Sequence, residues 1–361
     1  MTLLQLSLWG KETLPTLNVP HTEAEWQSLY QAAERQTVTG LLYEAVQLLP
    51  EEMLPPISLM MQLAVRAETI EQQNRRMNRV LRKLSSLMEE LDAKAAIFKG
   101  QTLAANYRTP SLRECGDIDL YLLDPADEGR VRLALEERGM TVTRHPDGAL
   151  SYRLGGIEVE HHSRLIDLHR PSLQRYVREL MDEEGFERVV IDGEETALLT
   201  PTPTLHLLLQ NTHILKHAMG NGVGLRQLCD MARSYHQWHS MVDGDRLKEV
   251  YRRCGLLRWS RLLHTFLVRE LGMPLEDLPY TEELLPHADA LKDIITEGGN
   301  FGQHTEHWQR TSFSPWLRKW HTLTSFLRHA TFSLRYAPSE TVWTILTLMK
   351  GQTFNGERYK G

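Results

Sequence analysis

The chain has 361 residues, enough for two or three domains, and its 41% hydrophobic and 24% charged residues are typical of a globular protein. The formal net charge of −6 gives no overall basic field that would favour nucleic acid as a partner. No apolar run approaches the roughly 20 residues of a membrane helix, and three scattered cysteines form neither a disulfide framework nor a zinc motif. Without a basic leader or cleavage site at its start, the sequence predicts a cytoplasmic protein with free thiols.

The N-terminal part of the chain is predicted to be helical after an irregular start at residues 1–20, which contain two prolines. Thr22 and Glu25 match a capping box at the beginning of a helix. A short helix is expected at 37–49. At 58–92, apolar residues recur at helical spacing between charged ones, which predicts one long helix.

A change of pattern near residue 95 predicts a strand, a tight turn and a helix. Residues 95–98 form a short apolar run, Lys99 and Gly100 form the turn, and the helix follows at 101–107. A helix N-terminus offers free N–H groups and the positive end of a dipole, Gly100 allows close approach of the backbone, and Lys99 adds a charge. These features are consistent with a phosphate site, but taken alone they are more typical of an ordinary strand-to-helix turn with an exposed lysine.

The segment 113–123 alternates apolar and polar residues with a period of two, which is typical of a half-buried strand. Its apolar residues share one face, and Asp117 and Asp119 share the other. Two carboxylates at this spacing lie roughly 6–7 Å apart at their backbones, so their oxygens are able to converge on one divalent cation. Taken alone, such a pair is more typical of the solvated face of an edge strand.

A third carboxylate is expected on a later strand. After a predicted helix at 127–138, residues 151–162 have the pattern of a hairpin. The second arm of this hairpin alternates, which places Glu158, Glu160 and His162 on one face. Glu160 is the first choice for the third carboxylate, and Glu158 is its rival.

The remainder of the chain is predicted to be mostly helical. A hairpin with an Asp-Gly turn is expected at 189–199. Helices are expected at 204–219, 225–238, 245–271, 281–296 and 315–334, the last with interleaved basic and aromatic residues. The fold class is therefore α+β and rich in helix, with a small mixed sheet between two helical flanks. The predicted regions are 1–93, 94–199 and 200–361.

The order of these motifs resembles the polymerase-β-like nucleotidyltransferase superfamily, most closely the bacterial group called uncharacterised nucleotidyltransferases. Residues 98–100 are similar to the LKG turn of this group, and 113–120 are similar to its RxxxDIDLLV strand. Residues 159–165 are similar to its VDLHWRL strand, and 225–232 to the LRWLxDxA segment of its helical region. The resemblance covers about residues 90–235 and implies a nucleotidyltransferase core at 94–199.

The resemblance implies transfer of NMP from an NTP, with ATP favoured, to a hydroxyl of a small molecule, a sugar or a protein. Asp117, Asp119 and Glu160 are the implied catalytic residues and ligands of two Mg²⁺ ions, with Mn²⁺ as the second choice. The residues implied to bind nucleotide or substrate are Lys99, Gly100, Gln101, Arg113, His162, His213, Lys216, Arg226 and Asp230.

Several of these residues also have a structural interpretation. Arg113 is placed either to contact phosphate or to pair with one of the aspartates. His162 either orients Glu160 or the acceptor, or packs within the sheet. Arg226 and Asp230, four residues apart on a predicted helix, are also spaced for a surface ion pair.

Two other functions stay open at this point. Gln101 stands where the family usually has serine or glycine, which favours a non-catalytic nucleotide-binding or scaffold protein with a degenerate nucleotidyltransferase fold. A metal-dependent phosphohydrolase also uses an Asp-x-Asp pair, but its nucleophile typically ends the first strand of its domain, whereas here a strand and turn precede the pair. Neither a membrane nor nucleic acid is indicated as a partner.

Overall fold

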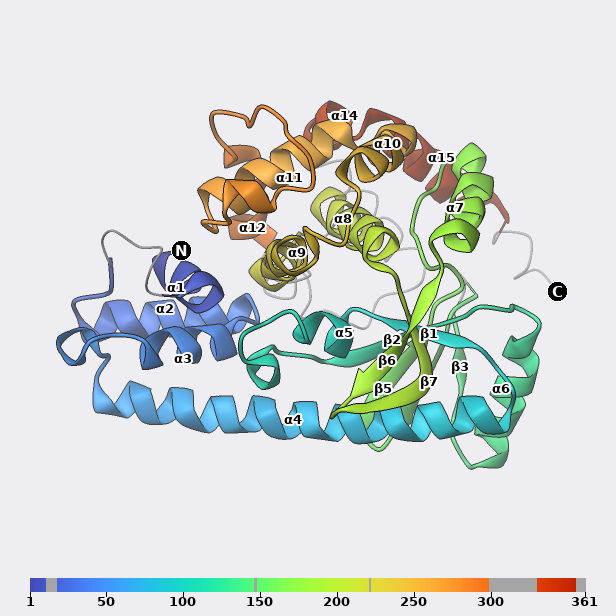
Figure 1. Ribbon diagram of the computed structural model, residues 1–361, viewed down its shortest axis with the longest axis horizontal. Coiled ribbons are helices and arrows are strands. Elements are labelled where there is room, and N and C mark those ends of the chain that lie inside the picture. The colour runs from blue at the N-terminus through green and yellow to red at the C-terminus, as the bar shows by residue number, and fades with distance from the viewer. Residues whose placement is uncertain (11–17, 146–147, 221, 299–329, 355–361) are drawn as a thin grey trace. The chain divides into compact units, whose positions relative to one another are not determined.

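The computed structural model describes residues 1–10, 18–145, 148–220, 222–298 and 330–354 (Figure 1). Most of the helix predicted at 315–334 therefore lies outside the described residues. By its internal contacts the chain divides into two compact units, which are described separately. Unit 1 consists of Met1–Leu165 and Glu183–Leu207, and unit 2 consists of Ile166–Asp182 and Leu208–Gly361. The three regions predicted from the sequence stay a prediction.

The helices of unit 1 precede or connect its strands. They are α1 (Thr2–Trp9), α2 (Glu23–Arg35), α3 (Thr39–Gln47), η2 (Glu51–Met53), α4 (Ile57–Glu90), α5 (Gly100–Ala104), η3 (Pro110–Leu112) and α6 (Asp127–Glu137). The predicted capping box is present, because Thr22 and Glu25 exchange backbone-to-side-chain hydrogen bonds of 3.0 and 3.2 Å. The prediction that residues 1–20 are irregular was wrong over α1. Four buried leucines stabilise this helix through tertiary packing, which overrides the weak local pattern.

Seven strands of unit 1 form one mixed sheet. They are β1 (Ala95–Phe98), β2 (Asp117–Leu122), β3 (Thr143–Arg144), β4 (Leu150–Leu154), β5 (Ile157–His161), β6 (Phe186–Ile191) and β7 (Glu194–Pro201). Their order across the sheet is β3-β4-β5-β2-β1-β7-β6. The pairs β2–β5 and β1–β7 are parallel, and the other neighbours are antiparallel. The predicted helix-rich α+β class with a mixed sheet is confirmed.

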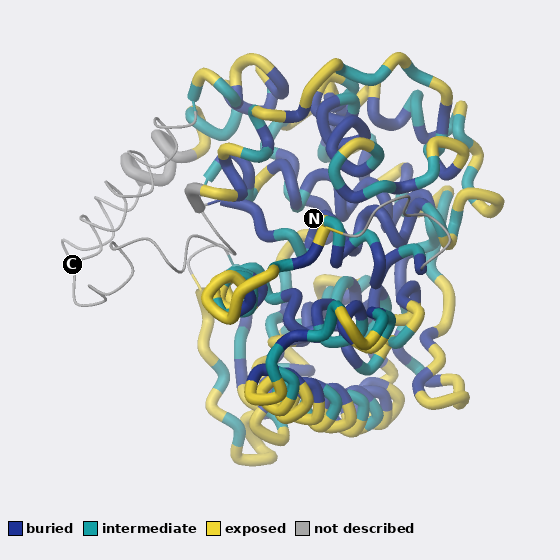
Figure 2. Tube along the Cα trace, turned by 90° about the vertical axis from the view of Figure 1, so that its left-hand side faces the viewer, coloured by how far each residue is buried: buried dark blue, intermediate teal, exposed yellow. Residues whose placement is uncertain are grey.

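The long helix α4 lies along one face of this sheet (Figure 1). Its buried side includes Met77 and Leu84, which share one apolar core with Ile118 and Leu120 of β2 and Val159 of β5. Figure 2 shows this helix nearly end-on, with its buried side toward the sheet and its exposed side turned away. The opposite face of the sheet is therefore the face on which the polar residues of β2 and β5 lie.

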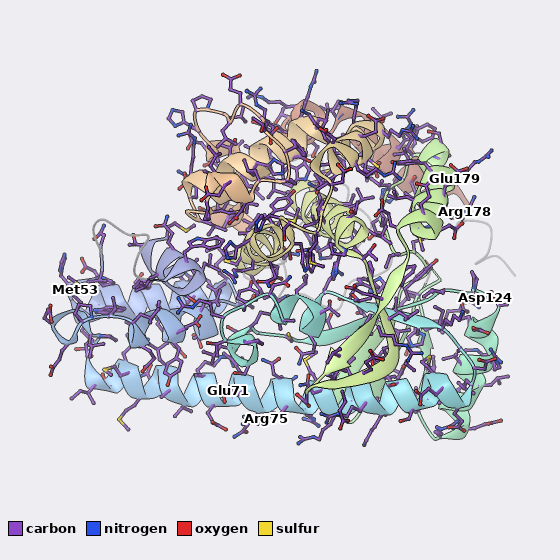
Figure 3. The ribbon with its side chains drawn as sticks, viewed as in Figure 1. Met53, Glu71, Arg75, Asp124, Arg178 and Glu179 are labelled. Atoms are coloured by element: carbon purple, nitrogen blue, oxygen red, sulfur yellow. The ribbon has the colours of Figure 1, made fainter. Side chains whose placement is uncertain are left out.

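The exposed side of α4 carries ion pairs within the helix. Arg75 lies 2.9 Å from Glu68 and 3.3 Å from Glu71, and Figure 3 marks Glu71 and Arg75 on this helix. Such exposed pairs contribute only a few tenths of a kcal/mol, roughly 0.2–0.5. Burial of the apolar side, and not these pairs, therefore holds α4 in place.

Polar contacts tie α4 and α3 to the loop that leads into β2. Glu114 is buried, and its two carboxylate oxygens accept from Thr39 N and from Arg66 Nη2, each at 2.8 Å. The buried Asn74 of α4 donates to the carbonyl oxygen of Arg113 at 3.0 Å. A buried carboxylate with both oxygens engaged is costly to disturb, so the start of β2 is held from two helices.

Unit 2 is built mainly of helices. The helices that lie wholly or partly in it are α7 (Pro171–Glu184), α8 (Pro203–Met219), α9 (Leu225–Trp238), α10 (Gly244–Cys254), α11 (Leu257–Arg269), η4 (Leu275–Asp277), α12 (Asp289–Gly298), α14 (Ala330–Tyr336) and α15 (Pro338–Phe354). The helix predicted at 245–271 is two helices, because Gly255 adopts a left-handed φ of 74° between them. The helix predicted from 281 begins only at Asp289. Of the helices that the structure describes, none combines the length and apolar character needed to cross a membrane.

Gly40 provides a test of how α3 packs against the loop before β2. A Cβ at this position would lie 1.9 Å from the carbonyl oxygen of Leu112, which is too close for any side chain. We expect Gly40→Ala to lower the free energy of unfolding by about 1–3 kcal/mol, because backbone must move to relieve the overlap. Urea unfolding followed by circular dichroism measures the change.

Gly129→Ala is the matched control for this substitution. Gly129 lies in α6, and a Cβ there would meet nothing within 4 Å. Alanine favours the helix over glycine, so this variant should gain about 0.5–1 kcal/mol. Equal effects of the two substitutions would contradict the proposed close contact at Gly40.

Candidate active site

The register of three strands places the predicted acids on one face of the sheet. In the parallel pair β2–β5, Asp117 lies opposite Glu158 and Asp119 lies opposite Glu160. In the antiparallel pair β1–β2, Phe98 lies opposite Asp119. Residues paired across neighbouring strands point to the same side, so all five side chains lie on the face away from the apolar core with α4.

His162 joins this group one residue after β5 ends. Its backbone N donates to Leu120 O at 2.7 Å, so the pairing with β2 continues to this position. Its imidazole therefore lies on the same face as Glu160. Asp119, Glu160 and His162 each offer a ligand atom within 4.8 Å of the others, and they form the one such group of three among the described residues. Such a set of oxygen and nitrogen donors fits a divalent cation.

Asp119 is the best-defined member of this group. It is 8% exposed, and its Oδ1 lies 3.2 Å from Lys99 Nζ and 2.6 Å from His162 Nε2. Burial alone would raise the pKa of Asp119, but the charge of Lys99 and the hydrogen bond from His162 outweigh burial and lower this pKa to about 2. The carboxylate is therefore ionised at neutral pH, and Lys99 Nζ donates to it.

Glu160 has the opposite electrostatic environment. Its side chain is about half-exposed, and one oxygen lies 3.8 Å from His162 Nε2. Partial burial, followed by the charge of Asp117, raises the pKa of Glu160, although His162 acts in the other direction. Glu158 is exposed, lies 3.8 Å from Arg153 and is not a member of the three-residue group. Asp117 is also exposed and outside that group, although its charge acts on Glu160.

The predicted turn at Lys99 and Gly100 is present between β1 and α5. Both residues have left-handed backbones, with φ of 64° and 44°. A Cβ on Gly100 would meet only Asp117 O, at 3.7 Å, so the turn is open on that side. Helix α5 has five residues and ends at Ala104 instead of 107, so the dipole that it offers a phosphate is smaller than expected.

Gln101 and Arg113 are engaged with the protein interior. Gln101 Nε2 donates to Asn78 Oδ1 at 2.7 Å, and its Oε1 accepts from Cys115 Sγ at 3.2 Å. Arg113 is 5% exposed, and its Nη1 lies 2.9 Å from Cys115 Sγ and 3.2 Å from the carbonyl oxygen of Glu114. These contacts hold the turn and the start of β2 against each other and against α4.

The other predicted substrate residues belong to unit 2. The ring of His213 lies 4.4 Å from the ring of His217, edge to face. Lys216 forms an ion pair with Asp167. Arg226 is half-buried and Asp230 is buried, both on α9.

Sequence reasoning missed Phe98 as a neighbour of the site. Its ring centroid lies 5.2 Å from that of His162 at an angle of 59°, and its face also meets Lys99 Nζ at 5.2 Å. Phe98 therefore packs against two residues that bind Asp119. The alternation along β1, which turns Phe98 and Ala96 away from the core of α4, is the signal that would have identified it.

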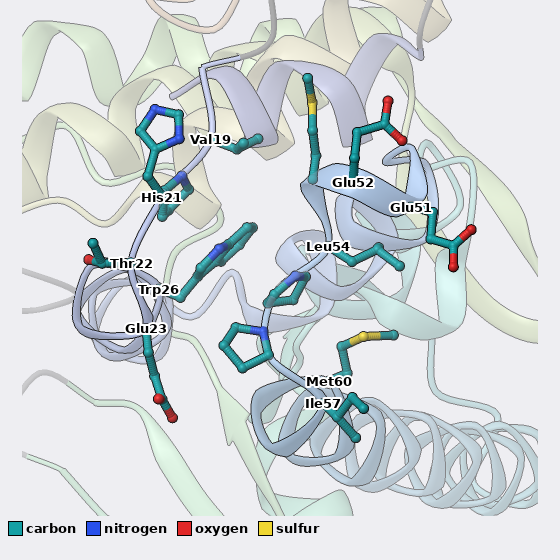
Figure 4. A pocket seen from close by; sticks show the side chains of 14 residues that line it. Val19, His21, Thr22, Glu23, Trp26, Glu51, Glu52, Leu54, Ile57 and Met60 are labelled. Atoms are coloured by element: carbon teal, nitrogen blue, oxygen red, sulfur yellow. The ribbon is translucent and has the colours of Figure 1, made fainter.

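A pocket of about 700 Å³ elsewhere in unit 1 contains none of the predicted site residues. It lies between the start of α2, η2 and the start of α4, as Figure 4 shows. Among the residues that line it are Trp26, Leu54, Met60, Glu23, Glu51 and Glu52. It has apolar walls and exposed acids, and nothing in it matches the chemistry of the carboxylate group.

Comparison with known proteins gives a family and two distant structures. The model of the uncharacterised nucleotidyltransferase family matches residues 22–271. No curated protein matches the chain. An antigenic nucleotidyltransferase-like protein from Paracoccidioides brasiliensis is 17% identical, with a TM-score of 0.31, over 44% of this chain and 75% of that one.

A tRNA nucleotidyltransferase complexed with a primer tRNA and an incoming ATP analog is 13% identical, with a TM-score of 0.23, over 76% of this chain and 98% of that one. With scores this low, neither superposition carries an argument. The family match includes all seven strands, the carboxylate group and the whole of α9, α10 and α11. The chain therefore belongs to the family of uncharacterised nucleotidyltransferases.

Proposed function

We propose that this nucleotidyltransferase moves NMP from an NTP, with ATP favoured, to a hydroxyl acceptor by a metal-dependent carboxylate mechanism. We also propose that it is of the polymerase-β-like type and belongs to its bacterial group. The observation that carries the mechanism is the convergence of Asp119, Glu160 and His162 within 4.8 Å on one face of the sheet. The family assignment gives the reaction class, and these donors supply the chemistry that it needs.

In this proposal Asp119 is the permanent anion of the site. Its carboxylate is buried and stays ionised even at a pH well below neutral, so it is able to hold a cation without first losing a proton. Glu160 completes the group, and we propose that the exposed Asp117, whose charge acts on Glu160, helps to hold a second ion. Mg²⁺ fits the two carboxylates and pairs with phosphate substrates. Bound cations would neutralise charge on the triphosphate and align the acceptor hydroxyl with the α-phosphorus.

We also propose that Glu160 acts as the general base. The acceptor oxygen forms a bond to the α-phosphorus, the bond from that phosphorus to the bridging oxygen breaks, and pyrophosphate leaves. The acceptor hydroxyl must lose its proton during this step. Glu160 has an accessible carboxylate beside the other members of the group, which suits it to receive that proton.

Lys99 is proposed to bind the phosphates from the turn after β1. Its ammonium group already lies beside Asp119, at the end of a strand whose next residue has an open, left-handed backbone. A triphosphate at Asp119 would therefore lie within reach of Lys99 and of backbone N–H groups at the start of α5.

A non-catalytic nucleotide-binding or scaffold protein is the second candidate. Gln101 favours it, because its side chain binds Asn78 and Cys115 and replaces the serine that the family usually offers to phosphate. The catalytic proposal and this alternative differ in one measurable result, which is whether NMP is transferred.

Asp119→Asn tests the catalytic proposal. The purified chain is incubated with a bacterial lysate, a divalent metal and ATP labelled at the α- or the γ-phosphorus. We expect the α-label and not the γ-label to appear on an acceptor. Asp119→Asn should reduce this transfer by about 100-fold or more, because it removes a permanent negative charge from the proposed metal site. Thermal unfolding verifies that the variant is folded.

Glu187→Gln is the matched control, because Glu187 is an exposed carboxylate on β6 of the same sheet. It should leave transfer unchanged. Transfer that persists in Asp119→Asn would rule out the carboxylate mechanism. ATP binding without any transfer would favour the scaffold, and transfer of the γ-label would indicate a kinase-type reaction.

Lys99→Met tests the electrostatic link to Asp119. Burial raises the pKa of Asp119, and without the ammonium group only His162 opposes this effect. The pKa of Asp119 should therefore rise from about 2 by about one unit or more. Carboxyl ¹³C NMR titration in metal-free buffer measures this pKa. The stability that the wild-type carboxylate contributes is complete above its ordinary pKa of 3.8 and is lost as the pH falls toward 2.

The variant should therefore be less stable at neutral pH and should protonate Asp119 at a higher pH than the wild type. Lys94→Met, which removes an exposed lysine just before β1, is the control and should leave the pKa of Asp119 in place. A pKa still near 2 in Lys99→Met would assign the effect to His162 alone.

A further inference from the structure

The carboxylate group of this site includes a nitrogen donor. His162 Nε2 lies 2.6 Å from Asp119 Oδ1 and 3.8 Å from Glu160 Oε2, so one imidazole nitrogen faces both carboxylates. A side chain that only packed against the sheet would not need to point its polar edge at two acids. The position of Nε2 is equivalent to that of a third ligand atom, since all three donors lie within 4.8 Å of one another.

The imidazole is held in this position from two sides. The backbone N of His162 donates to Leu120 O at 2.7 Å, which extends the β2–β5 pairing to this residue. The ring of Phe98 lies 5.2 Å from the imidazole, on the strand next to β2. The side chain of His162 is about one quarter exposed, so water and ions are able to reach it. A ligand held this way loses little conformational entropy when it binds.

The donor set determines which cation the site prefers. Mg²⁺ favours oxygen ligands in a near-ideal octahedron and keeps several waters. Imidazole nitrogen is a softer donor, and divalent ions of the first transition series bind it better than Mg²⁺ does. Mn²⁺ accepts both carboxylate and imidazole and is the usual functional substitute for Mg²⁺ at phosphate.

We infer that His162 binds the metal directly through Nε2, beside Asp119 and Glu160, and that the site therefore prefers Mn²⁺ to Mg²⁺. This inference rests on the proposed function, because it names the ion that the carboxylate mechanism uses. It also gives His162 a role different from that of a group that orients Glu160 or the acceptor. The alternative is that His162 only donates a hydrogen bond to Asp119, and the two roles differ in whether nitrogen contacts the ion.

Electron spin echo spectroscopy of Mn²⁺ bound to the full chain tests this contact directly. Mn²⁺ is added alone, without nucleotide, so that the protein is the one source of nitrogen. We expect echo modulation from a directly coordinated ¹⁴N, which changes to the ¹⁵N pattern when the protein carries ¹⁵N-histidine. This arm uses the wild-type chain and needs no variant to fold.

Calorimetric titration with Mn²⁺ and with Mg²⁺ gives the selectivity. We expect tighter binding of Mn²⁺ by the wild type. In His162→Asn, whose shorter side chain leaves no donor at the position of Nε2, the Kd for Mn²⁺ should rise by about 10-fold or more, whereas that for Mg²⁺, which depends on the carboxylates, should change much less. The nitrogen modulation should vanish in the same variant. His145→Asn is the control, because His145 is an exposed histidine of the same unit that bonds Ser151, and it should alter neither measurement.

Mn²⁺ that binds in an Asp119-dependent way without coordinated nitrogen would overturn the inference and leave the proposed function standing. An equal Mn²⁺-to-Mg²⁺ preference in the wild type and in His162→Asn would overturn it as well. Failure of both ions to bind, with or without ATP, would overturn the metal mechanism itself. The two failures are therefore distinguishable.

Discussion

The parallel pairing of β2 with β5 is the constraint on which the site depends. It sets Asp119 opposite Glu160, and His162 follows on the same face. Side chains alternate along a strand, so a shift of one residue would turn the polar set of one strand toward α4. Burial of Ile118 and Val159 against that helix opposes such a shift, because it would expose apolar side chains and bury charged ones. The apolar core thus fixes the geometry of the polar face.

A second set of contacts holds the strand from its N-terminal end. Asn74 and Glu114 bind the loop before β2 to α4 and α3, and Gln101 binds the turn after β1 to α4. Each contact engages a buried or half-buried polar group, so each is more directional than the apolar packing around it. The N-terminal helices therefore hold in place the strand that carries Asp117 and Asp119.

Strand and helix periodicity made much of this predictable. The alternation at 113–123 and the apolar spacing in 58–92 are local signals. The helix formed at Ile57–Glu90 as expected, whereas the strand is shorter than predicted and spans Asp117–Leu122. The inward direction of Gln101 and Arg113 was not predictable, since it depends on groups far away in the sequence, on α4 and next to Cys115. Residues 1–20 were misassigned for a related reason: α1 is stabilised by burial, which leaves little local trace. The parallel pairing of β2 with β5 was also not predictable, because a period-two pattern identifies a strand but does not show which strand it pairs with.

The electrostatics of Asp119 fit the proposed catalytic site better than the proposed degenerate one. A carboxylate that is 8% exposed is costly to bury, and here a lysine and a histidine are both committed to the same oxygen. If these residues served only the stability of the fold, well-packed apolar residues in their place would leave the free energy of unfolding unchanged or raise it. Partial burial and then the charge of Asp117 raise the pKa of Glu160, and Asp119 adds a smaller contribution. The like charges of Asp117 and Glu160 on one face of the sheet repel each other, and a bound cation would relieve this repulsion.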